Sequence, residues 1–192
     1  MRLVLATRNL HKVEELQALL GPGNVEIVPA SAFPDVPDVV EDGDTFEANA
    51  IKKAVTLARA TGLPALADDS GLEVDALKGA PGVRSARYAS EPVSHDANNR
   101  KLLEALRDEK NRTARFRCVL ALAEPSGEVR TVEGVCEGHI AGACRGTGGF
   151  GYDPLFIPDG YRETFAELSP MEKNLLSHRG RAVAAARQAF RL

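Results

Sequence analysis

The sequence contains no tryptophan, few aromatic residues (5%) and only three cysteines. Cys118, Cys136 and Cys144 are odd in number, and none belongs to a Cys-x-x-Cys pair. This pattern excludes a complete disulfide framework and a zinc site built from closely spaced cysteines. Cys118 stands in the apolar run 116–123, where we expect a buried and unreactive thiol.

A surplus of positive charge and a long apolar run are also absent. Lysine and arginine number 24 against 27 aspartates and glutamates, which gives a net charge of -3. Proteins that bind nucleic acid non-specifically usually carry an excess of lysine and arginine, so we expect no nucleic-acid partner. No segment approaches the roughly 18 apolar residues of a membrane span, and residues 3–6 are typical of a strand and not of a signal peptide. We therefore expect no membrane partner and a cytoplasmic location.

The 192 residues and the hydrophobic content of 44% suffice for a core of their own, and we expect 1–192 to be a single domain. The first half alternates between strand and helix patterns. Strands are predicted over 2–6, 25–28 and 65–69. Helices are predicted over 9–20 and from an N-cap at Asp44 or Thr45 to 61. The first helix is expected to end at Gly21-Pro22-Gly23 and the second at Gly62, after an irregular loop over 29–43. In the second helix the apolar face is predicted at Ala48, Ile51, Ala54, Val55 and Ala58.

The second half of the sequence has a different pattern of predicted elements. A capped helix is predicted over 94–106, and the β-rich runs 114–123 and 128–137 flank a turn and indicate an antiparallel hairpin. A glycine-rich loop over 145–153 leads into 154–157. Ser169 to Glu172 form a capping box, Gly180 is expected to mark a break, and Ser177 to cap a last helix. Together the halves predict an α/β fold: a central mixed, twisted sheet with flanking helices, a second lobe, and a substrate cleft between the lobes.

The first candidate site is Thr7-Arg8-Asn9-Leu10-His11-Lys12, where a strand turns into a helix. Free amides at a helix start favour an anion, and Lys12 adds a positive charge one turn later. An ordinary helix cap with a solvated lysine also fits, and the Gly-x-x-x-x-Gly-Lys spacing of a Walker loop is absent.

The second candidate is Asp68-Asp69-Ser70-Gly71, at the predicted end of an apolar strand. Adjacent carboxylates are costly to bury unless a cation or hydrogen-bond donors meet them. Successive strand side chains point to opposite faces, so both aim at one point only if the chain bends at Ser70-Gly71. One carboxylate is expected to bind Mg²⁺ or to activate a water molecule, while the other stabilises the loop. The alternative is a turn-forming motif. An Asp-x-Asp arrangement is absent, which argues against an aspartyl-phosphate mechanism.

Three further segments carry weaker signals. Glu41-Asp42-Gly43-Asp44 with Glu47 offers hard oxygen ligands for Mg²⁺, although an acidic helix start also fits. In the loop 146–153, glycines allow close approach, Phe150 or Tyr152 could stack on a base, and Asp153 could accept a hydrogen bond; a hairpin loop with buried aromatics is the alternative. Lys173 and Ser177-His178-Arg179-Gly180 form the last segment. A predicted break between helices places His178 and Arg179 where they could read a carbonyl oxygen; a structural histidine is the alternative.

Taken in order, these segments resemble the inosine/xanthosine triphosphate pyrophosphatase family, which removes deaminated purine nucleotides. The resemblance is carried by Thr7 to Lys12, 45–50, 67–72, 79–83, 85–88, 146–154 and 177–180. Each segment is weak alone, but the ordered set covers nearly the whole chain. It implies cleavage between the α- and β-phosphates of a purine nucleoside triphosphate, dependence on Mg²⁺, and a homodimer. A relative with another base preference and a nucleotide-binding module without turnover stay open as alternatives.

The resemblance also implies roles for single residues. Asp69 is similar to the family's general base and metal ligand, and Lys12 to the residue that stabilises charge on the phosphates. Glu41 is expected to be the second metal ligand, with Asp38, Asp42 or Glu47 as alternatives. Substrate contacts are implied for Thr7, Arg8, Asn9, Leu10, His11, Lys12, Ser70, Phe150, Gly151, Tyr152, Asp153, Lys173, His178 and Arg179. Asp68 is left as the supporting carboxylate.

Overall fold

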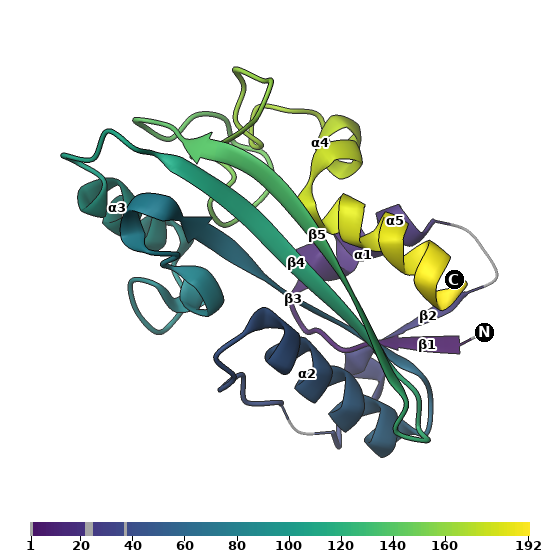
Figure 1. The fold of residues 1–192 in the computed structure, drawn as a ribbon. Helices are drawn as coiled ribbons and strands as arrows, with labels where there is room; N and C mark the ends of the chain where they lie inside the picture. Colours follow the sequence, from purple (N-terminus) through teal and green to yellow (C-terminus); the bar gives the residue numbers. More distant parts are fainter. Residues whose placement is uncertain (1, 22–24, 37) are drawn as a thin grey trace. The chain divides into compact units, whose positions relative to one another are not determined.

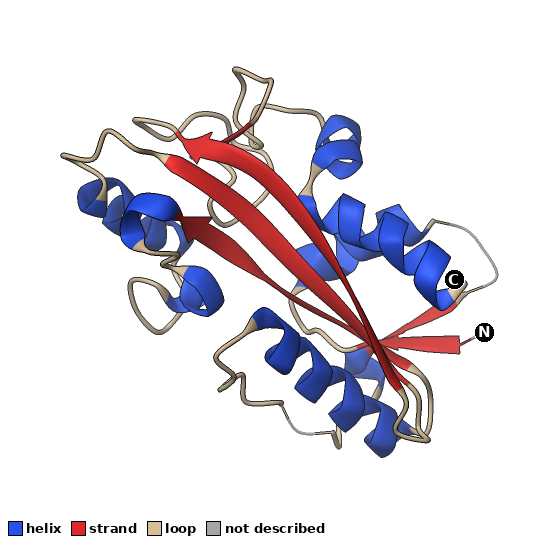
Figure 2. Cartoon of the chain, in the orientation of Figure 1, coloured by secondary structure: helices blue, strands red, loops and turns tan. Residues whose placement is uncertain are grey.

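The computed structural model describes residues 2–21, 25–36 and 38–192, and its strands form one mixed sheet (Figures 1 and 2). In the described part of the chain the strand order is β2-β1-β3-β4-β5-β6. β1 pairs in parallel with β2 and β3, whereas β5 pairs with β6 in the antiparallel sense. The strands are β1 (Arg2–Leu5), β2 (Glu26–Pro29), β3 (Ala65–Val74), β4 (Thr113–Ala123), β5 (Val129–Ile140) and β6 (Phe156–Pro158). The predicted α/β fold with a mixed sheet is confirmed.

Two helices begin at caps that the sequence predicts. Thr45 accepts a hydrogen bond from the amide of Ala48, and Gly62 ends the same helix in the left-handed conformation. The capping box from Ser169 to Glu172 is present. The helices are α1 (Leu10–Leu20), α2 (Phe46–Thr61), α3 (His95–Ala105), α4 (Pro170–Leu176) and α5 (His178–Phe190), with short 3₁₀ turns at Ala30–Ala32, Asp75–Leu77 and Gly82–Arg87.

The chain divides into two compact units. Unit 1 comprises Met1–Asp69, Cys118–Gly134 and Arg179–Leu192, and unit 2 comprises Ser70–Arg117 and Val135–His178. The boundaries fall inside β3, β4, β5 and α5, so each of these elements has residues in both units. The carboxylates of the Asp68-Asp69 pair both belong to unit 1.

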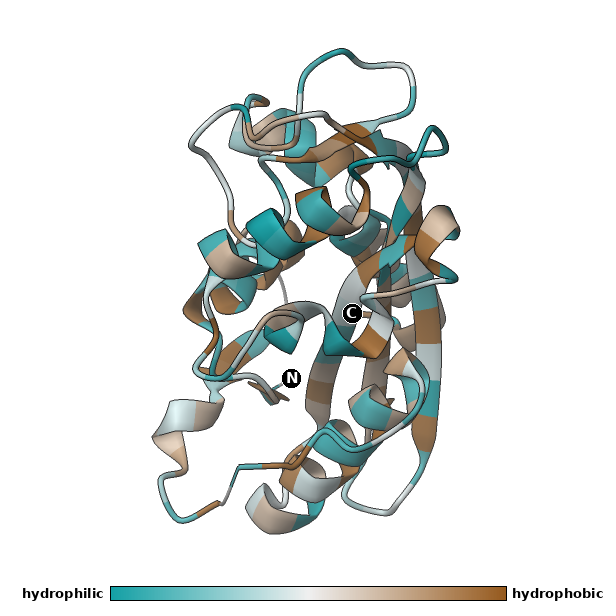
Figure 3. Ribbon diagram, turned by 90° about the vertical axis from the view of Figure 1, so that its left-hand side faces the viewer, coloured by the Kyte–Doolittle hydropathy of each residue, from teal (hydrophilic) through white to brown (hydrophobic). Residues whose placement is uncertain are grey.

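The core of unit 1 follows from the alternation of side chains along its strands. One face of β1, β3 and β4 packs against α1 and α5, while Val4, Ala65 and Ala67 are buried on the other face, on the side where Figure 1 shows α2. The hydropathy colours of Figure 3 show hydrophobic residues along the strands. The cluster toward α1 and α5 contains Leu3, Leu5, Leu16, Leu20, Leu66, Cys118, Leu120, Leu122, Ala182, Val183, Ala186 and Phe190.

Unit 2 has a separate core rich in aromatic rings. Phe116 packs edge-on against Phe156, with ring centroids 4.8 Å apart, and stacks on Phe165 at 5.8 Å. Leu72 and Val74 of β3 join this cluster and are fully buried. Each unit therefore buries apolar side chains of its own, and β3 supplies residues to both.

Four predicted boundaries were wrong. β3 does not end at Asp69 but continues to Val74, because Leu72 and Val74 extend the buried apolar pattern beyond Ser70-Gly71. Gly180 lies inside α5, and the break falls at Ser177, whose ψ of 158 is extended; packing of the flanking residues outweighs the cost of about 1 kcal/mol for a helical glycine. The loop 29–43 contains the turn Ala30–Ala32, and the strand predicted to end at 137 extends to Ile140. Pro22 and Gly23 lie outside the described residues.

The packing predicts the stability effect of a single core truncation. Leu120→Ala should lower the free energy of unfolding by about 2–5 kcal/mol, because the side chain is fully buried among α1 and α5 residues. The matched change Leu10→Ala, at a side chain that is 74% exposed, should alter it by no more than about 0.5 kcal/mol. Urea denaturation followed by circular dichroism measures both values, and equal effects would contradict this description of the core.

Candidate active site

Asp68 and Asp69 point to opposite faces of the sheet. The strand runs straight through Ser70, so the bend that would aim both carboxylates at one point does not occur. Asp68 lies on the face toward α1 and α5, and Asp69 on the face toward α2, as their partners show below. Both are buried, with exposures of 1% and 6%. The acidic pair therefore forms two sites with different surroundings.

Asp68 is surrounded by donors from three elements. Its Oδ1 forms an ion pair with the ammonium of Lys12 from α1. Its Oδ2 accepts from Arg179 Nε at 2.9 Å and from the thiol of Cys118 at 3.1 Å. Burial alone would raise the pKa of Asp68, but the adjacent Arg179 and Lys12 hold that pKa well below its ordinary value of 3.8. This carboxylate is a fixed anion.

Asp69 is held differently, by one lysine from α2. Lys53 Nζ donates to Asp69 Oδ1 at 3.2 Å, to the backbone oxygen of Asp68 at 2.7 Å and to Glu41 Oε1 at 2.6 Å. Asp69 Oδ2 is buried and has no hydrogen-bond partner in the described part of the chain. Burial raises the pKa of Asp69, against the opposing effect of Lys53. A carboxylate with a raised pKa and an unsatisfied oxygen is suited to accept a proton or hold a cation.

Lys53 is a candidate functional residue that the helical pattern of the sequence assigns to solvent. The predicted apolar face of α2 included Ala48, which is exposed; the buried face instead carries Phe46, Asn49, Ala50, Lys53, Ala54, Leu57 and Ala58. Although burial lowers the pKa of a lysine, Asp69 and Glu41 more than offset it, and the pKa of Lys53 is raised. The available signal was its position one residue before Ala54, on the stripe through Ala50 and Leu57.

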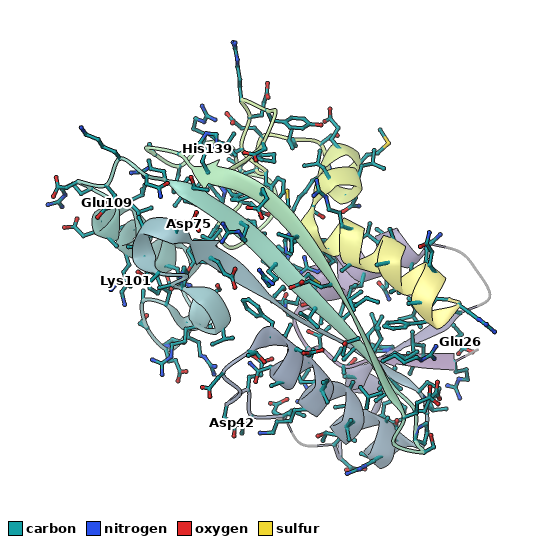
Figure 4. The ribbon with its side chains drawn as sticks, viewed as in Figure 1. Glu26, Asp42, Asp75, Lys101, Glu109 and His139 are labelled. Atoms are coloured by element: carbon teal, nitrogen blue, oxygen red, sulfur yellow. The ribbon has the colours of Figure 1, made fainter. Side chains whose placement is uncertain are left out.

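The four acidic candidates for a second metal ligand have different neighbours. Asp38 pairs with Arg8 at 3.0 Å, Asp42 with Lys52 at 2.6 Å, and Glu47 accepts from Thr131 at 2.8 Å. Asp42 lies at the outer edge of the loop before α2 (Figure 4). Glu41, in contrast, shares the ammonium of Lys53 with Asp69. The contacts therefore favour Glu41 among the four.

The residues that would hold a cation fit Mg²⁺. The described residues contain no group of three or more His, Cys, Asp or Glu side chains gathered as a metal site. Mg²⁺, however, needs only one or two carboxylates when water and phosphate oxygens complete its shell. Such a pair is supplied by Glu41 beside Lys53 and by Asp69, one of whose buried oxygens has no hydrogen-bond partner among the residues described.

The segment from Thr7 to Lys12 forms the predicted helix cap. Asn9 Oδ1 accepts from the amide of Lys12 at 3.3 Å, and Thr7 Oγ1 accepts from the amide of Asn9 at 3.2 Å. Leu10 and His11 are exposed, and Arg8 donates to the backbone oxygen of Val36. Within this segment it is Lys12 that the structure brings to the acidic pair.

In unit 2 the glycine-rich loop is organised by Asp153. Its Oδ2 accepts from the amide of Phe150 at 2.9 Å and from Lys173 Nζ at 2.7 Å. The same ammonium lies 5.3 Å from the centre of the Phe150 ring. A Cβ added at Gly149 would lie 2.0 Å from Asp153 Oδ2, so this position requires glycine. Three predicted residues, Phe150, Asp153 and Lys173, thus form one cluster.

The neighbouring loop residues are tied to the backbone of unit 2. Tyr152 is buried and donates its hydroxyl to the Ser85 backbone oxygen at 2.8 Å, an arrangement that fits the alternative of a loop with buried aromatics. Asn99 Nδ2 donates to the backbone oxygen of Gly151 at 3.0 Å. Asn99, on α3, was not expected to contribute to this loop.

His178 and Arg179 begin α5 but fall in different units. His178 is buried in unit 2, its ring stacked on Phe116 with centroids 4.7 Å apart. Arg179 is buried in unit 1 between Asp68 and Glu15, with Nη1 paired to the Glu15 carboxylate. Ser70, which follows Asp69 along β3, is half-buried and is the first residue of unit 2.

These features define an α/β protein with a cationic cluster around one fixed carboxylate and a second carboxylate suited to a cation or a proton. In the described residues no helix is long and apolar enough to cross a membrane.

Comparisons identify the family. A model of the Ham1 family matches residues 3–189. The dITP/XTP pyrophosphatase of Desulforamulus reducens is 58% identical over 185 residues, covering 95% of this chain and 92% of that protein. The dITP/XTP pyrophosphatase of Geobacter sulfurreducens is 54% identical, covering 95% and 93%. The structure of a HAM1 protein from Coxiella burnetii aligns with a TM-score of 0.92 and 45% identity, covering 100% and 98% of the two chains. The chain belongs to the Ham1 family.

The two carboxylates predict opposite effects on stability. The lowered pKa of Asp68 means that its charge stabilises the fold at pH values above its ordinary value of 3.8, and that this contribution is lost as the pH falls through the folded pKa. At neutral pH, Asp68→Asn should therefore destabilise the protein by about 3–5 kcal/mol, the cost of breaking a buried ion pair.

Asp69 has a raised pKa, so its charged form is disfavoured in the folded state. Ionisation of Asp69 therefore destabilises the folded protein as the pH rises. The isosteric change Asp69→Asn should accordingly raise the free energy of unfolding at neutral pH. Urea denaturation of both variants at pH 7 measures the two shifts. Shifts of the same sign would contradict the separate surroundings of the two carboxylates.

Proposed function

We propose that the chain is a nucleoside triphosphate pyrophosphohydrolase that converts the deaminated purine nucleotides ITP, dITP and XTP to the monophosphate and pyrophosphate. The names of the relatives from Desulforamulus reducens and Geobacter sulfurreducens support this activity. The observation that carries it in this chain is the buried Oδ2 of Asp69, which has no hydrogen-bond partner among the described residues and belongs to a carboxylate beside Lys53 and Glu41. Removal of such nucleotides prevents their incorporation into DNA and RNA.

Asp69 is the proposed general base. A water oxygen forms a new bond to phosphorus, the α–β anhydride bond breaks, and pyrophosphate leaves. The proton of that water passes to the carboxylate of Asp69, whose burial raises its pKa and so its affinity for a proton. Lys53 holds Oδ1 of the same carboxylate, which orients Oδ2 for this transfer.

Asp69 and Glu41 are the proposed ligands of Mg²⁺. When bound, the ion would withdraw negative charge from the phosphates and orient them. Lys12 supplies a further positive charge for the developing negative charge on phosphate oxygens. Its segment, from Thr7 to Lys12, presents the amides of a helix start to the same anion.

The base and sugar are assigned to the remaining predicted residues. Phe150 offers a ring for stacking, and Asp153, held by Lys173, offers a carboxylate acceptor. Inosine and xanthosine carry an oxygen at position 6, where adenine carries an amino donor. The donors of His178 and Arg179 would pair with that oxygen and leave adenine unpaired. Guanine shares this oxygen, so its rejection requires another contact.

Assembly and location belong to the same proposal. We propose a homodimer, with no nucleic-acid or membrane partner, in the cytoplasm. The low net charge supports the absence of a nucleic-acid partner, and the described residues contain no helix that could span a membrane. Light scattering during size-exclusion chromatography gives the molecular mass in solution.

A substrate panel tests the proposed function. With Mg²⁺, the kcat/KM for ITP, dITP and XTP should exceed that for ATP, GTP and dUTP by at least about tenfold, as judged by pyrophosphate release. In the Asp69→Asn variant the rate on ITP should fall by about 10²–10⁴-fold, which shows that the activity belongs to this chain.

Equal or greater turnover of ATP and GTP would overturn the deaminated-purine assignment. Preferential turnover of a pyrimidine would indicate a relative with another base preference. Binding of ITP without release of pyrophosphate would indicate a nucleotide-binding module.

The metal assignment is tested at two adjacent acids. Glu41→Gln should raise the Mg²⁺ concentration for half-maximal activity by at least about tenfold, because it removes one of two carboxylate ligands. Asp42→Asn should leave that concentration unchanged, because Asp42 is exposed and pairs with Lys52. An effect of Asp42→Asn larger than that of Glu41→Gln would reverse the assignment.

A further inference from the structure

Asp68 lies at the centre of a charge network that the proposed proton transfer does not use. Its Oδ1 pairs with the ammonium of Lys12 on α1, and its Oδ2 accepts from Nε of Arg179 on α5 at 2.9 Å. The Cys118 thiol on β4 donates to the same Oδ2 at 3.1 Å. One side chain of β3 therefore joins donors from two helices and a strand.

Glu15 extends the network beyond Arg179. Arg179 Nη1 pairs with the Glu15 carboxylate, and Glu15 lies three residues after Lys12 on the same helix. Residues three apart in a helix lie on one face, so α1 offers a cation and an anion side by side. Positive and negative side chains therefore alternate in the order Lys12, Asp68, Arg179 and Glu15. The guanidinium of Arg179 is held between two carboxylates.

We propose that Asp68 is a positioning residue that holds Lys12 and Arg179 jointly in place for the substrate. This inference deepens the proposed function, in which Lys12 meets the phosphates and Arg179 the purine oxygen. A displacement of either group by about 1 Å can cost on the order of 100-fold in rate. Asp68 thus couples the residue assigned to the triphosphate to the residue assigned to the base.

The geometry of the donors supports this role. A lysine has a flexible stem, and its ammonium has three donors, so pairing with Asp68 orients it and leaves donors for phosphate oxygens. The Lys12 side chain keeps 15% of its surface exposed, while that of Asp68 has none. An arginine fork needs two fixed acceptors to define its plane, and Asp68 and Glu15 provide them.

The alternative is that Asp68 only stabilises the fold as a buried ion pair. The two roles differ in one measurable ratio. A destabilised enzyme loses active molecules, which lowers kcat/KM for every substrate by one factor. A misplaced Arg179 instead weakens the preference for an oxygen at position 6. We therefore expect Asp68→Asn to lower the ratio of kcat/KM for ITP to that for ATP by about tenfold.

A mutant cycle tests the coupling directly. Asp68→Asn alone should lower kcat/KM for ITP by about 100-fold. In a background that already carries Lys12→Met and Arg179→Met, the same change should lower it by less than about threefold, because the groups that Asp68 positions are gone. An equal factor in both backgrounds, or an unchanged ITP to ATP ratio, would overturn the proposal.

Two further variants keep the test decisive. Asp68→Glu retains the charge but moves it by one methylene, and it replaces Asp68→Asn in the cycle if circular dichroism shows the latter to be unfolded. Wild-type kinetics in a folded Asp68→Glu protein, or failure of both variants to fold, would overturn the positioning role. Glu26→Gln is the control, because this exposed acid on β2 (Figure 4) pairs with Arg2 and should leave all kinetic constants unchanged.

The proposed function and the positioning role fail in different ways. Absence of pyrophosphate release by the wild-type protein would contradict the proposed function alone. The dissociation constant for ITP, measured by calorimetry, would then replace kcat/KM in the mutant cycle. Coupling between Asp68 and the two cations in that constant would support the positioning role, whereas its absence, or no binding of ITP, would overturn it.

Discussion

The alternation of side chains along β3 is the constraint on which the candidate site depends. Because successive residues of a strand face opposite ways, Asp68 and Asp69 cannot share one environment. Asp68 meets Arg179, Lys12 and a thiol, whereas Asp69 meets Lys53 and keeps one buried oxygen without a partner in the described residues. A single dipeptide thereby places a carboxylate with a lowered pKa on one face and a carboxylate with a raised pKa on the other.

Burying these charges requires the rest of unit 1. A buried carboxylate is tolerated only where cations and donors compensate for lost hydration. The helices α1 and α5 bring Lys12 and Arg179 to one face, and their apolar residues form the core cluster with the strands on that same face. On the other face α2 turns Lys53 inward between alanines. Packing and electrostatics thus rely on the same three helices.

Much of the fold could be predicted from the sequence, because its signals are local. The Thr45 and Ser169 caps, the Gly62 terminus and the apolar strand runs all act within a few residues, and the structure confirms them. Lys53 could not be predicted in this way, since a lysine in a helix is usually solvated and its acceptors lie 12 and 16 residues away. The contact of Tyr152 could not be predicted for a related reason, because its acceptor is the backbone oxygen of Ser85, 67 residues away.

The sequence by itself determined the class of fold, the order of elements and the identity of the acidic pair, since these follow from short-range periodicity and from motifs in a fixed order. The tertiary structure decided which carboxylate faces which cation. It continued β3 through Ser70-Gly71, and it paired the neighbouring acids Glu41 and Asp42 with different lysines. The physical reason is that the pKa of a buried acid depends on charges brought near it by folding, and neither spacing nor composition specifies those neighbours.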